Sequence, residues 1–133
     1  MTIRTEIREA LADLVRQAEP ALKEVFPSRP FSVDATDLPL AFCYFTEGAE
    51  GDYSLDEESE SAPLMVSIYV TEHNKADAEL DVLADKVKKL KGDDLGGLLL
   101  EGLSAPTWQY GVDEMGTGLA SLTLNFNATW SEQ

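Results

Sequence analysis

Two segments of strict two-residue alternation limit the fold more than any other feature of the sequence. The segment 64–71 places an apolar side chain at every second position from Leu64 to Val70. The last segment repeats this pattern with Ala120, Leu122, Leu124, Phe126, Ala128 and Trp130. A period of two puts apolar side chains on one face of a β-strand. Both segments are therefore predicted to be strands with one face in a core.

The remaining elements follow from other patterns. Apolar residues spaced by three or four predict helices over 3–18 and about 75–91. The segment 38–45 is apolar at almost every position, as in a strand covered on both faces, and should pair with 64–71. The leucines of 94–103 should fill the core, and 107–112 should pair with the last strand. The expected fold is α+β, in the order α-β-β-α-β-β, with a mostly antiparallel sheet and two helices packed on one face.

Length and charge restrict the possible functions. The 133 residues fit a single domain over 1–133. The formal net charge of −15 argues against a general electrostatic surface for DNA, RNA or anionic membranes. Cys43 is the only cysteine, which excludes an internal disulfide.

The negative charge is concentrated in one segment. All 10 basic residues fall within 1–29 and 75–91. Seven acids lie close together with no base among them: Glu47, Glu50, Asp52, Asp56, Glu57, Glu58 and Glu60. This composition predicts a flexible, solvated acidic loop at about 47–62. Calcium binding of the EF-hand type is excluded, because Glu57 and Pro63 occupy the positions that need glycine and glutamate. Weak Mg²⁺ or Ca²⁺ association stays open.

Four further residues are candidates for contacts between chains. Tyr53 and Leu55 are large apolar residues within the acidic segment and would gain from burial against a neighbour. Asp77 and Asp81 share one face of the second helix. They are candidates for an interface or metal site, although acids near a helix start also offset the helix dipole.

Catalytic motifs are missing from the sequence. His73 is the only histidine, and neither a G-x-S-x-G motif nor a glycine-rich phosphate-binding motif occurs. We therefore expect no enzyme activity and no cofactor.

The order of short motifs resembles a known family. Arg29-Pro30, Asp37-Leu38-Pro39, the acidic segment and Asp77-Ala78-Glu79-Leu80-Asp81 follow one another along the chain. In this order they resemble the minor tail protein U family, the tail terminators of lambda-like long-tailed phages. The resemblance covers nearly the whole chain and is best over 29–81.

The resemblance implies a structural virion protein made in the host bacterial cytoplasm and assembled into the phage tail. Family members cap the tail tube as a ring, expected to be a hexamer, and so end tail polymerisation. The implied partners are other copies of the chain, the major tail tube protein and the head-tail connector, while DNA passes through the lumen without specific binding. The acids of 50–60 would then line the lumen or lie between subunits, with a possible Mg²⁺ dependence of assembly. The neutral polar face of the last strand would pack on a neighbour or a tube subunit.

Two alternatives remain open at this point. An acidic DNA-mimic or adaptor that inhibits a DNA-binding partner would also carry a large negative charge. A small carboxylate-metal hydrolase could use the acidic cluster.

Overall fold

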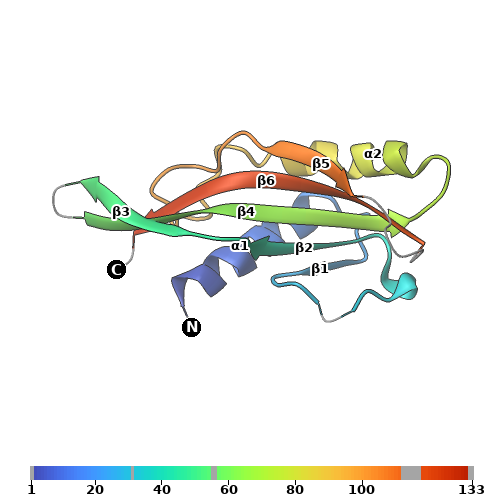
Figure 1. The fold of residues 1–133 in the computed structure, drawn as a ribbon, viewed down its shortest axis with the longest axis horizontal. Helices are drawn as coiled ribbons and strands as arrows, with labels where there is room; N and C mark the ends of the chain where they lie inside the picture. The colour runs from blue at the N-terminus through green and yellow to red at the C-terminus, as the bar shows by residue number, and fades with distance from the viewer. Residues whose placement is uncertain (1, 31, 55–56, 112–117, 132–133) are drawn as a thin grey trace.

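Both helices pack on the same face of one sheet (Figure 1). The computed structural model describes residues 2–30, 32–54, 57–111 and 118–131. Helix α1 (Ile3–Ala18) begins after Thr2, whose hydroxyl accepts a hydrogen bond of 3.3 Å from the Thr5 N–H. Helix α2 (Ala76–Lys88) has acids in its first turn and lysines in its last, as the helix dipole favours. The predicted α+β fold with two helices on one face is confirmed.

The sheet is mostly antiparallel and is built around one long central strand. Its strands are β1 (Glu24–Phe26), β2 (Leu40–Phe45), β3 (Ala49–Ser54), β4 (Glu57–Thr71), β5 (Thr107–Gly111) and β6 (Leu119–Ser131). Their order is β1-β2-β4-β6-β5, and β3 pairs with β4. The predicted pairings of β2 with β4 and of β5 with β6 are confirmed. The sequence does not reveal β1, which pairs in parallel with β2, because three residues show no periodicity.

The core lies between the helices and the sheet. Alternate residues of β4 and β6 are fully buried there, including Leu64, Ile68 and Phe126. The leucines at 95, 99 and 103 also enter this core, as expected, although their segment forms turns and bends. On the opposite face, Leu40 and Phe42 belong to a second, smaller apolar cluster. Strand β2 is thus covered on both faces, as its continuous apolar run predicts.

The acidic segment differs from the expected loop. Residues 49–54 form β3, and β4 already begins at Glu57. Strand β3 lies on the same side of β4 as β2, because β6 occupies the other side of β4 at Ser59–Ser61. Phe45 pairs with Leu64 and Ala49 pairs with Ser61, so 46–48 contains one residue more than the facing 62–63. This extra residue is a β-bulge, and Pro63, which has no N–H to donate, lies opposite it.

In the described ranges, no helix is long and apolar enough to cross a membrane.

The single cysteine is buried. Cys43 is 0% exposed, and desolvation raises the pKa of its thiol to about 12, although the charge of Arg16 lowers it slightly. Because the thiolate is the reactive form, we expect Cys43 in the folded protein to resist a maleimide or iodoacetamide at pH 8. Mass spectrometry after a timed pulse should show no adduct on the native chain and one on the urea-unfolded chain. Complete labelling of the native chain within the same pulse would contradict this burial.

Candidate interaction surfaces

An acidic arm extends from one end of the sheet. We define it as 49–54 together with 57–61, the paired segments of β3 and β4. In Figure 1 it reaches past the end of α1, at the end of the sheet opposite α2. Its register makes Glu50 the partner of Glu60 and Asp52 the partner of Glu58. In the register of this arm, acidic residues are therefore paired with acidic residues.

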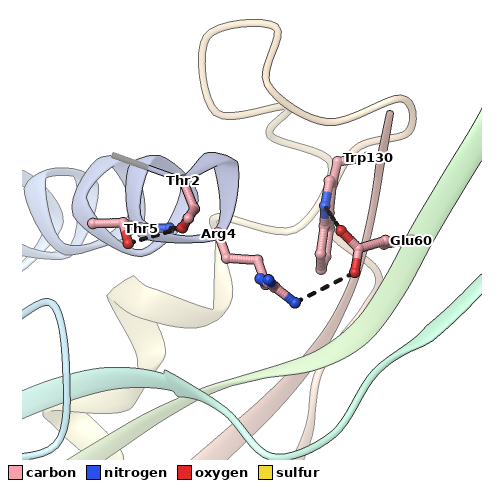
Figure 2. Close-up of polar contacts among 5 residues, drawn as sticks. All are labelled: Thr2, Arg4, Thr5, Glu60 and Trp130. Carbon is pink, nitrogen blue, oxygen red and sulfur yellow. Dashed lines mark hydrogen bonds and ion pairs between the residues drawn. The ribbon is translucent and has the colours of Figure 1, made fainter. Parts of the chain in front are cut away.

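The arm is fixed at its root by Glu60. Figure 2 shows the Glu60 carboxylate between α1 and β6. One oxygen lies 3.5 Å from the Arg4 guanidinium, and the other accepts a 3.3 Å hydrogen bond from the indole N–H of Trp130. The Glu60 side chain is 19% exposed, and Trp130 is 1% exposed. Glu60 is therefore a structural residue of the monomer, in addition to any role in the arm.

The sequence pattern places Glu60 among the other acids, because the residues that Glu60 contacts are distant along the chain. Arg4 and Trp130 lie 56 and 70 residues away from it. The contact with Trp130 could be found from the strand register, because Glu60 pairs directly with Trp130 once β4 is aligned with β6.

Of the other residues predicted for the arm, some lie in β3 and β4 and two lie outside the described residues. Glu50, Asp52 and Tyr53 belong to β3, whose register shifts between Asp52 and Ser54. Glu57 and Glu58 are the first two residues of β4. Leu55 and Asp56 lie outside the described residues.

The structure brings Asp77 and Asp81 to the side of α2 that faces β5. The hydroxyl of Tyr110 donates a hydrogen bond to Asp81. That bond, together with the negative charges of Asp81 and Asp77, raises the pKa of Tyr110 to about 12. Nearby, the Lys88 ammonium lies 5.4 Å from the centre of the Trp108 ring. Asp81 therefore helps join α2 to the edge strand β5 within the chain.

His73 lies beside the start of α2. Its Nδ1 accepts a 3.1 Å hydrogen bond from the Lys75 N–H, which leaves Nε2 to donate to Glu79 at 2.8 Å. Both nitrogens are thus engaged in local structure. Within the described ranges, no three His, Cys, Asp or Glu residues come together as a group able to hold a metal ion.

A polar face lies on the side of the sheet away from the helices. We call it the open face and define it by residues of β4, β5 and β6: Met65, Ser67, Thr107, Gln109, Ser121, Thr123 and Asn125. Hydroxyl groups connect across it, with Ser67 lying 3.1 Å from the Tyr44 hydroxyl and 2.8 Å from that of Thr123. It contains a hollow of about 480 Å³, whose lining includes Tyr69 and Gln109. This face can make hydrogen bonds and apolar contacts.

Three comparisons with known proteins bear on this arrangement. The sequence model of the family described as phage minor tail protein U matches residues 2–130. Among curated proteins, nothing matches. A solved structure titled as the virion of a native gene transfer agent particle has 13% identity and a TM-score of 0.50, covering 98% of this chain and 92% of that chain. A second solved structure has 14% identity and a TM-score of 0.54, covering 98% of this chain and 94% of that one.

At these identities the two structures show a shared fold and nothing further. The family match, in contrast, spans almost the entire sequence. The chain therefore belongs to the phage minor tail protein U family, a family of non-enzymatic structural proteins of the virion tail.

Proposed function

We propose that this tail protein closes the end of the tail tube as a hexameric ring. Such a ring ends tube polymerisation with one rim and presents the other rim to the head-tail connector. Family membership supports a tail role, and the observation that carries the ring is the acidic arm. The arm projects from one end of the sheet, beyond α1 (Figure 1). In a ring we expect it to reach the neighbouring copy.

The charge of the arm favours a contact with another copy of the chain or with a cation. Glu50 and Asp52 have acids as register partners. At the root of the arm, Arg4 forms an ion pair with Glu60. A divalent cation or a base from the adjacent subunit would relieve the remaining repulsion. We therefore place the arm at the contact between subunits, and there Tyr53 and Leu55 would supply apolar contacts.

The same charge suits a passage for DNA. Carboxylates that line a lumen repel phosphates, so the genome would pass without being held. The acids proposed for this role are Glu50, Asp52, Asp56, Glu57 and Glu58. Glu60 is set apart from them because it forms the root of the arm.

The ring is tested directly on the purified chain. Sedimentation velocity across a series of Mg²⁺ and salt concentrations, with and without purified tail tubes, should show a step from monomer to hexamer. Electron microscopy of the same samples should show rings, or tubes closed at one end. A chain that stays monomeric in every condition, tubes included, would overturn the proposal.

Charge reversal in the arm should change both assembly and DNA passage. In a Glu57→Lys/Glu58→Lys variant, we expect less Mg²⁺ to be needed for ring formation, because repulsion between arms falls. Phage titre in a complementation assay should fall at least about tenfold, because lysines in the lumen would hold the DNA backbone.

The matched control is Glu9→Lys/Glu101→Lys, which makes the same charge change at exposed positions outside the arm. If both variants give the same Mg²⁺ midpoint and the same titre, the arm has no part in assembly or passage.

A further inference from the structure

The open face carries no charge in a chain where 26% of residues are charged. Its residues are hydroxyl, amide and thioether side chains, and the outward positions that continue it along β6, Asn127 and Thr129, are neutral as well. An antiparallel sheet face that only meets solvent has no need to exclude charge. Copies of a chain with a net charge of −15 repel one another. A second copy therefore meets the least electrostatic repulsion at a surface without carboxylates.

A positive charge lies beside this face. The Arg29 guanidinium lies over the Tyr44 ring, 5.1 Å from its centre, and the Tyr44 hydroxyl contacts Ser67 of the open face. Arg29 is itself exposed. The open face and its border therefore offer hydroxyl and amide donors together with one cation. These groups suit a partner surface rich in carboxylates.

The first half of α2 is such a surface. Asp77, Glu79 and Asp81 lie there, and all three are exposed. Next to them, Val82 is 65% exposed, although it is a large apolar residue. An apolar side chain that stands in solvent among acids gains from burial in a hollow. The hollow of about 480 Å³ on the open face is lined by Tyr44, Met65, Tyr69 and Gln109, among others.

The two surfaces lie on opposite sides of the subunit. Helix α2 covers one face of the sheet, and the open face is the other. A contact between unlike surfaces on opposite sides of a subunit is heterologous, and repetition of such a contact closes a ring when the rotation fits. A symmetric dimer would instead place like surfaces together.

We infer that the open face of one copy receives the first half of α2 from the next copy, with Val82 in the hollow and Arg29 beside the carboxylates of α2. This inference rests on the proposed ring and adds a second contact between neighbouring copies to the one made by the arm.

A pair of glutamine substitutions tests the charge argument. Gln109 in the open face and Gln17 on α1 are both exposed, so Gln→Glu adds one charge at each with little change in shape. A carboxylate within about 4 Å of another weakens a contact about fivefold even in water. We expect Gln109→Glu to weaken ring formation at least about fivefold by sedimentation and Gln17→Glu to leave it unchanged. Gln109→Lys should assemble at least as well as the unmodified chain.

Crosslinking tests which surfaces meet. One preparation carries Val82→Cys and another carries Gln109→Cys, and each is treated with a short bis-maleimide alone and after mixing. Buried Cys43 does not compete for the reagent. We expect a covalent dimer in the mixture and none in either preparation alone.

The outcomes separate this inference from the ring itself. If rings form, are not weakened by Gln109→Glu and give no crosslink in the mixture, the inference about the surfaces is wrong. The proposed ring is then still supported. Crosslinking of Val82→Cys alone would show a symmetric contact and would also overturn it. If the unmodified chain forms no ring in any condition, both the proposed ring and this inference are overturned.

Discussion

Replacing Trp130 by alanine should destabilise the folded chain by about 3–5 kcal/mol, the range found for large aromatic residues in closed cores. Trp130 is 1% exposed near the end of β6, and its ring centre lies 5.2 Å from that of Phe45. The substitution removes this aromatic contact, leaves a cavity and takes away the donor that binds Glu60. The free energy of unfolding from urea titration, followed by circular dichroism, gives the measurement.

The chain offers a matched control for this substitution. Trp108 is 55% exposed and packs against Lys88 and Tyr110 at the edge strand. Exposed contacts of this kind contribute up to about 1 kcal/mol, so Trp108→Ala should cost no more than this. Equal losses in free energy for the two variants would contradict the described burial of Trp130.

Substitution of Glu60 should have the next largest effect. In Glu60→Ala the buried indole N–H of Trp130 loses its acceptor, and an unsatisfied buried donor costs about 1–3 kcal/mol. In Glu60→Gln the side-chain carbonyl still accepts from Trp130, and the variant loses only the ion pair with Arg4. The Arg4 side chain is 54% exposed, so that loss should be below about 1 kcal/mol.

The Glu60 variants also test how the arm is held in place. Hydrogen exchange of the β3 amides should be faster in Glu60→Ala than in Glu60→Gln, because only Glu60→Ala removes the hydrogen bond between residue 60 and Trp130. Arg4→Gln should behave like Glu60→Gln in both measurements. If Glu60→Ala and Glu60→Gln lose the same free energy, the hydrogen bond to Trp130 does not fix the arm.

The sequence predicts the body of the fold because its signals are local. Alternation at 64–71 and 120–130 identifies β4 and β6 together with their buried faces, and the three-to-four spacing identifies both helices. The motif order also leads to the correct family. These features repeat over many residues, so each is visible without knowledge of the tertiary structure.

The arm could not be predicted in the same way. Residues of 47–60 are mostly glycine and acids, which have low intrinsic preference for strands. Strand β3 forms through its pairing with β4, and this tertiary contact overrides the local composition. The contacts of Glu60 likewise depend on register between distant segments. The sequence therefore locates the charged segment but reveals neither its strand pairing nor its attachment through Glu60.

Strand β4 connects the arm directly to the core and can transmit force between them. It runs for 15 residues, roughly 50 Å at the usual rise per residue, from the arm through the centre of the sheet. The bulge at 46–48 interrupts only the neighbouring edge, while β4 continues and stays paired to β6 through Thr71. In the proposed ring, a pull on the arm by a neighbouring copy would therefore be carried along a single continuous backbone into the core. Load on the arm would then reach the body of each copy in that ring.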